Sequence, residues 1–160
     1  MSKLEIVHHK TEHLLDRALV VLDKAIMMIP DDQLLFKPTS ENMTAKQLAS
    51  HIYQTLYVLT RTASLGEFRL SHLGGIPFEL DKVTTASHIV DYGASVKRYV
   101  GEAVADFREE DLDRVVNPEW KMTGFDAMNT AFEEAIHHRG QVQLYLRLMG
   151  LEPPYLYDYS

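Results

Sequence analysis

The stretch Glu134–Gln141, reading Glu-Ala-Ile-His-His-Arg-Gly-Gln, gathers the side chains of this sequence best suited to chemistry. No proline interrupts the segment around it, which favours a helix. Helical residues four apart lie one above the other on the same face, the arrangement found in helix-borne zinc pairs. Two such pairs occur here, Glu134 with His138 and Glu133 with His137. The pair that faces inward is the one able to hold a metal ion.

The direction of each pair follows from the turn of the helix, about 100° per residue. At that angle a broad apolar face collects Phe125, Met128, Ala131, Phe132, Ala135, Ile136, Val142, Leu146 and Met149. His138 falls at the flank of this face with Glu134 a little further round, whereas His137 and Glu133 point to solvent. The candidate pair is therefore Glu134/His138. The alternative is an ordinary surface Glu–His pair, worth only about 0.2–0.5 kcal/mol, because a bound metal normally needs three protein ligands.

Composition narrows the class of protein. A net charge of −7 and the lack of any basic block argue against binding to nucleic acid. The absence of cysteine excludes disulfides and thiolate metal sites. The apolar runs are too short to span a bilayer, and the N-terminus lacks a signal-like pattern. We expect a soluble, cytoplasmic, single-domain protein over residues 1–160, with no nucleic-acid or membrane partner.

Four amphipathic segments with apolar residues at intervals of three and four predict four long helices. They cover about Val7–Ile29, Ala45–Leu65, Thr85–Phe107 and a last segment that carries the Glu134–Gln141 stretch and ends before Gly150. Thr44 is the predicted N-cap of the second helix, with Gln47 at the capping-box spacing. Since no segment alternates convincingly with period two, we expect an all-α four-helix bundle. Two connectors are long enough that a simple up-down-up-down order is not assured.

Further polar residues lie on these helices and connectors. His51 lies at the flank of the apolar stripe of the second helix, where a lone histidine is usually a hydrogen-bonded residue at the core edge. His9 and His13 form another i, i+4 pair, expected to be solvated unless a third ligand meets it. His72 lies in the irregular loop 66–82 and is expected at the surface without a role. Trp120, the only tryptophan, falls in a polar connector, Glu109–Lys121.

The loop 66–82 has glycines and a proline but is not wholly polar. We expect its apolar side chains to cover part of a cavity mouth. They are Phe68, Leu70, Leu73, Ile76 and Phe78.

Several short motifs in this sequence resemble those of one protein family. They are Phe36–Thr39 ahead of the second helix, Leu48–Ile52 within it, His137–Gln141 in the last helix, and Leu146–Gly150 followed by Pro153–Tyr155. Together they resemble the DinB/YfiT-like superfamily of metal-binding four-helix bundles, over essentially the whole length. The His-His-Arg-Gly-Gln motif combined with an upstream histidine is the specific part of this resemblance.

The resemblance implies a divalent metal held by one histidine of the second helix and two residues at i and i+4 of the last helix. Transferred to this sequence, the implied ligands are His51, Glu134 and His138. Glu134 stands where the family usually has histidine, but a carboxylate remains a competent ligand beside two imidazoles. Its oxygen broadens the expected choice of metal to Zn²⁺, Ni²⁺, Mn²⁺ or Fe²⁺.

The resemblance also implies function. Members look like thiol-dependent transferases, which use the metal to activate a low-molecular-weight thiol, or like hydrolases; a small-molecule substrate and a homodimer are expected. The sequence shows no Ser–His–Asp constellation, phosphate loop or nucleotide fingerprint, so the metal would carry the chemistry and no catalytic side chain is assigned. Two alternatives remain open: a non-catalytic bundle that binds a metal or small ligand, and a metal-free interaction protein induced under stress.

Overall fold

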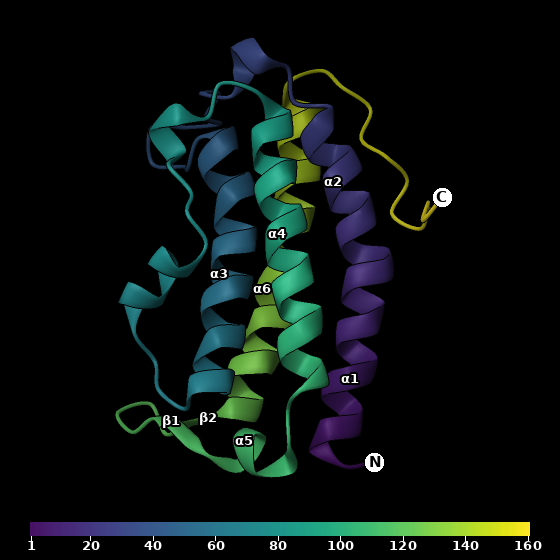
Figure 1. Cartoon of the computed structure of the whole chain (residues 1–160). Coiled ribbons are helices and arrows are strands. Elements are labelled where there is room, and N and C mark those ends of the chain that lie inside the picture. The colour runs from purple at the N-terminus through teal and green to yellow at the C-terminus, as the bar shows by residue number, and fades with distance from the viewer.

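The computed structural model describes residues 1–160, apart from the side chain of Leu73, so the part expected of Leu73 at a cavity mouth lies outside what is described. Four long helical rods run side by side (Figure 1). Their helices are α1 (Lys3–His13) and α2 (Leu19–Met27), joined by the π-helical turn Leu14–Ala18, then α3 (Ala45–Leu65), α4 (Ala86–Ala105) and α6 (Gly124–Leu148). The prediction of an all-α four-helix bundle is confirmed.

The helix carrying His51 begins and ends where the sequence predicts. The Thr44 hydroxyl accepts a hydrogen bond from the Gln47 amide at 3.2 Å, while the Gln47 side chain accepts one from the Thr44 amide at 2.8 Å. This capping box satisfies two amides that a helix start leaves without intrahelical partners. At the other end Gly66 adopts a left-handed conformation with φ of +79° and ends the helix. The capping box and Gly66 thus fix where α3, which carries His51, begins and ends.

The chain does not follow a simple up-and-down order. In Figure 1 the α1–α2 rod rises from the N-terminus, α3 and α4 both descend, and α6 rises again. The connector between α3 and α4 therefore returns along the length of the bundle, with short 3₁₀ turns at Leu70–Gly75 and Leu80–Lys82. This route places the connector beside α3, where its residues Phe68 and Leu70 line a cavity together with His51.

The connector before α6 is more regular than its polar sequence predicts. It forms the short helix α5 (Glu109–Asp113) and an antiparallel pair of strands, β1 (Val115–Asn117) and β2 (Met122–Thr123). The sequence analysis did not predict this short hairpin, which is seen at the foot of the bundle (Figure 1). Its strands are too short for period-two alternation to show in the sequence.

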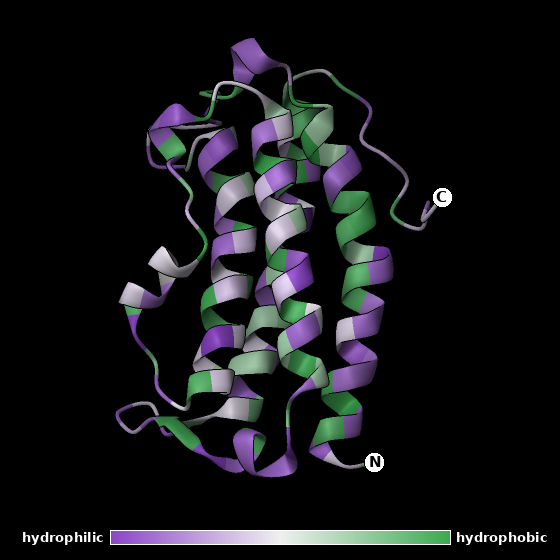
Figure 2. Cartoon of the chain, in the orientation of Figure 1, coloured by the Kyte–Doolittle hydropathy of each residue, from purple (hydrophilic) through white to green (hydrophobic). Residues whose placement is uncertain are grey.

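The core is apolar but contains one polar link. Hydrophobic and hydrophilic residues alternate along each long helix (Figure 2), and the apolar sides meet in a connected core. Within it the hydroxyl of the fully buried Tyr53 donates a hydrogen bond to Asp23, which also pairs with Lys97. Burial, the nearby charge of Asp23 and that hydrogen bond raise the pKa of Tyr53 well above its usual value. Over the described residues, no helix is both long enough and apolar enough to cross a bilayer.

Candidate metal centre

Helices α3 and α6 pack against each other and bring three potential ligands to one place. His51 comes from α3, and Glu134 and His138 come from successive turns of α6. Each offers one ligand atom, and these atoms all lie within 4.8 Å of one another. Across the described residues this is the only group of three or more His, Asp or Glu side chains with such a geometry. The predicted ligands are thus neighbours, while metal binding itself remains a prediction.

The Glu134 carboxylate lies between the two imidazoles. Its Oε2 is 3.1 Å from His138 Nε2 and 3.9 Å from His51 Nε2. The two rings meet edge to face, with centroids 4.9 Å apart and an interplanar angle of 80°. Ligands about 2.1 Å from a tetrahedral ion lie roughly 3.4 Å apart. The two Glu134 separations lie near that value and all three ligand atoms lie within 4.8 Å of one another, so rotations that draw the side chains together are needed to surround an ion.

Gln141, one turn beyond, fixes which nitrogen of His138 is free. His138 Nδ1 lies 2.7 Å from the Gln141 side-chain oxygen, and because an amide oxygen only accepts, Nδ1 carries the proton. The Gln141 amide nitrogen lies 3.0 Å from His137 Nε2 and donates to that ring. Metal-binding histidines usually donate their second N–H in this way. The sequence analysis missed this role, although Gln141 lies within the motif and at i+3 from His138.

Either a proton or a metal ion can satisfy the contact between His138 and Glu134. With its proton on Nδ1, a neutral His138 presents the Nε2 lone pair toward the Glu134 carboxylate at 3.1 Å. Two acceptors at this distance repel each other unless a proton or a metal ion lies between them. Two imidazole nitrogens and a carboxylate form a donor set suited to Zn²⁺ and other divalent transition metals. The residues present therefore fit a metal ion.

Partial burial favours the neutral, metal-binding form of His51. The side chain of His51 is 34% exposed and that of Glu134 39%, whereas that of His138 is 14% exposed. Burial lowers the pKa of His51, and the neighbouring His138 lowers it further, while Glu134 partly opposes the shift. A lowered pKa keeps the ring unprotonated near neutral pH, as metal binding requires.

Two cavities meet at this cluster. His51 and Glu134 line a cavity of about 320 Å³, bounded by α3, the connector after α3, the hairpin and α6. His138 and Gln141 line a second cavity of about 390 Å³ beside Met43 and the C-terminal end of α6. The cluster can therefore be reached by a small molecule from more than one direction.

The other histidines considered from the sequence lie elsewhere. His137 and Glu133 are exposed, as their helical angle predicts, and line a groove of about 570 Å³ together with His9 and His13. Among the described side chains, the His9/His13 pair gains no third ligand within the reach of a metal.

Two expectations for single residues are wrong. His72, predicted at the surface, is only 7% exposed, because the 3₁₀ turn Leu70–Gly75 packs it inward. Its burial, followed by the charge of Arg61, lowers its pKa. Ile136, predicted on the buried apolar face, is 43% exposed and lines the groove beside α1.

Comparisons with known proteins place the chain in a family. The sequence profile of the DinB family matches residues 1–160. The uncharacterized protein YjoA of Bacillus subtilis (strain 168) is 28% identical over 129 residues, which cover 76% of this chain and 77% of YjoA. The crystal structure of that DinB-like protein superposes with a TM-score of 0.75 at 23% identity, covering 93% of this chain and 98% of that one. From the match over its whole length, this chain belongs to the DinB family.

Proposed function

We propose that this protein is a divalent-metal-dependent enzyme acting on a small molecule at His51, Glu134 and His138, as a thiol-dependent S-transferase or a hydrolase. The observation that carries the proposal is the convergence of the three ligand atoms, with His138 oriented by Gln141. Three protein ligands leave coordination positions open, which distinguishes a catalytic from a closed structural site. When bound, the ion supplies Lewis-acid chemistry and raises the fraction of deprotonated thiol or water near neutral pH.

The side chains of this site have separate tasks in such an enzyme. His51 and His138 supply neutral nitrogen donors, and Glu134 supplies the negative charge that offsets part of the charge of a divalent ion. Gln141 holds the proton of His138 on Nδ1 and so keeps Nε2 turned toward Glu134. The cavities beside these side chains would hold the substrate.

A turnover screen tests the proposal. The chelated protein is reloaded with Zn²⁺, Ni²⁺, Mn²⁺ or Fe²⁺ and assayed with a panel of thiols and electrophiles and with hydrolytic substrates. At least one form is expected to exceed the chelated protein, and His138→Ala is expected to lose that activity. The matched control His137→Ala, one residue away on the exposed side, is expected to keep it. If every metal form stays at background, the non-catalytic binding bundle replaces the enzyme.

A further inference from the structure

The 320 Å³ cavity next to His51 and Glu134 has walls from four separate parts of the chain. Helix α3 forms one side, α6 another, and the hairpin and the connector after α3 close the remainder. Beyond those two residues, its apolar lining includes Val58, Phe68, Leu70 and Trp120. A volume of this size lies at the lower end of the usual range for small-molecule sites. The cavity therefore suits a compact ligand.

The lining of the metal-free cavity disfavours anionic ligands. Of the described side chains that line the cavity, none is Lys or Arg, and the two groups able to carry charge, His51 and Glu134, both belong to the cluster. The other polar groups are the neutral side chains of Gln54, Thr55 and Thr130. Phosphate and carboxylate ligands are normally held by Arg or Lys. In the metal-free protein, an anionic group in this cavity would lose its hydration without gaining a Lys or Arg partner, and it would lie beside the Glu134 carboxylate.

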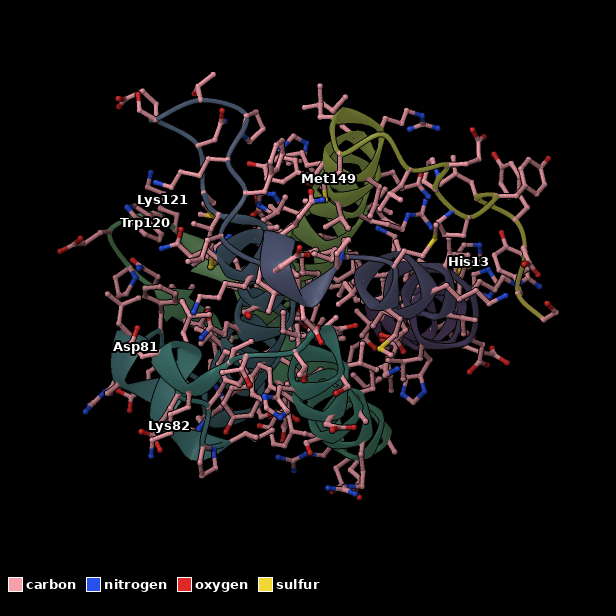
Figure 3. All side chains as sticks on the ribbon, turned by 90° about the horizontal axis from the view of Figure 1, so that it is seen from above. His13, Asp81, Lys82, Trp120, Lys121 and Met149 are labelled. Atoms are coloured by element: carbon pink, nitrogen blue, oxygen red, sulfur yellow. The ribbon has the colours of Figure 1, made fainter. Side chains whose placement is uncertain are left out.

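An aromatic pair forms the outer wall. The rings of Phe68 and Trp120 lie with centroids 5.6 Å apart at an angle of 49°. The Phe68 amide donates to the Val116 carbonyl at 2.9 Å, which ties the connector to strand β1 and holds both rings on one wall. Seen along the bundle, Trp120 lies at the periphery, on the opposite side from His13 (Figure 3). This wall is thus separate from the groove that His13 lines.

Trp120 is unusually exposed for so large an apolar side chain. Its exposed fraction is 63%, and that of the neighbouring Leu70 is 70%. Tryptophan buries a large area when it is covered, and its ring packs favourably against another aromatic ring. A ligand placed between these side chains and Val58 would cover apolar surface that the free protein leaves in water.

We propose that this cavity binds an uncharged small molecule with an apolar, aromatic group. That group lies against Phe68 and Trp120, and the reacting end lies beside His51 and Glu134. Only the placement of the reacting end rests on the proposed function; the choice of an uncharged, aromatic ligand rests on the cavity walls themselves.

The single tryptophan allows a direct test of the ligand class. N-phenyl-1-naphthylamine is a neutral aromatic probe, and 8-anilinonaphthalene-1-sulfonate carries nearly the same rings with an added sulfonate. Titrated into chelated protein, the neutral probe is expected to quench Trp120 emission saturably and to bind at least about tenfold more tightly than the anionic one. Equal or tighter binding of the sulfonate, or no saturable change in Trp120 emission, overturns the proposal.

A pair of exposed leucines locates the probe. Leu70 lines the cavity and is 70% exposed, whereas Leu35 is 68% exposed and lies on the connector before α3. Leu70→Glu is expected to weaken the neutral probe at least about tenfold, and Leu35→Glu is expected to leave it unchanged. Both changes are at the surface, so neither should unfold the protein. Equal weakening by the two variants places the probe elsewhere and overturns the proposal.

The metal separates this inference from the proposed function. The neutral probe is expected to bind the chelated protein, because the choice of ligand rests on the cavity walls and not on a bound ion. The proposed function, in contrast, requires a bound metal. Probe binding without turnover in any metal form would leave the ligand class standing and remove the enzyme. Turnover in a metal form without saturable binding of the neutral probe would leave the enzyme standing and remove the ligand class.

Discussion

At the scale of single residues, the most informative side chain is Glu134. It stands where the family resemblance implies a histidine, yet its Oε2 lies between the ring nitrogens of His51 and His138. With a carboxylate in this place, the donor set has two nitrogens and one oxygen. The negative charge of the carboxylate lowers the net charge of the site when a divalent ion is bound. This set is typical of catalytic zinc and non-haem iron sites.

Adjacent histidines provide a test of the geometry. His138→Ala removes a ligand and is expected to abolish stoichiometric metal binding. His137→Ala is expected to keep the metal and to change the free energy of unfolding by less than about 0.5 kcal/mol, because His137 is exposed on the far side of α6. Calorimetric titration measures metal binding, and urea unfolding of the metal-free proteins measures the free energy of unfolding. Loss of metal in His137→Ala together with retention in His138→Ala would show that the opposite face of α6 holds the ion.

At the scale of the elements, the position of His51 depends on how α3 packs against α4. Tyr53, two residues further along α3, is fully buried and hydrogen-bonded to Asp23. Its ring fills the space above Gly93 of α4, where an added Cβ would lie 2.5 Å from the ring. No low-cost movement is open to Tyr53, since its hydroxyl is already bound. Close packing here sets the distance between the two helices.

Two glycine substitutions on long helices test this packing. Gly93→Ala is expected to lower the free energy of unfolding by about 1–3 kcal/mol through overpacking against Tyr53. Gly140→Ala, on α6, meets no atom within 4 Å and is expected to raise stability by about 0.5–1 kcal/mol through helix propensity. Urea unfolding of the metal-free proteins compares them. Equal stability changes at the two sites would contradict the packing account.

The sequence predicted those parts of the molecule that depend on local pattern. The bounds of α3 followed from its period and the Thr44/Gln47 capping box, and the inward direction of Glu134 and His138 followed from the helical angle. The proximity of His51 to this pair came from the family resemblance instead. The period of one helix shows which face it buries but not which other helix covers that face.

The errors fall where contacts that no helical period predicts decide the outcome. The hairpin depends on the pairing of β1 with β2, strands of 3 and 2 residues. The position of Phe68 beside Trp120 depends on the hydrogen bond from Phe68 to Val116, which joins two connectors. His72 is buried because its own connector, between α3 and α4, forms the 3₁₀ turn Leu70–Gly75. Ile136 shows the opposite error, since its place on the apolar face is left partly uncovered beside α1. None of these contacts leaves a periodic signal in the sequence.

At the scale of the whole molecule, we propose that the protein forms a homodimer through its bundle helices, as the family resemblance implies. A stable interface buries more than about 1,000 Å² in total. Light scattering at high micromolar concentration is expected to give twice the 18.3 kDa of one chain. A mass equal to one chain across the concentration range would contradict the proposal.

Metal binding would also couple the site to the stability of the whole bundle, because His51 and the Glu134/His138 pair come from different helices. A ligand that binds only the folded state stabilises it by about 2.7 kcal/mol at a hundredfold excess over its Kd. Removal of the metal by a chelator is therefore expected to lower the Tm of the unchanged protein and to leave that of His138→Ala unaltered.

The most direct measurement is the metal content of protein purified without added metal, determined by elemental analysis beside His51→Ala. The three converging ligand atoms predict about one divalent ion per folded chain in the unchanged protein and less than about a tenth of that in the variant, since two ligands rarely retain an ion. Equal metal content in the unchanged protein and in the alanine variants of His51, Glu134 and His138 would contradict the metal centre.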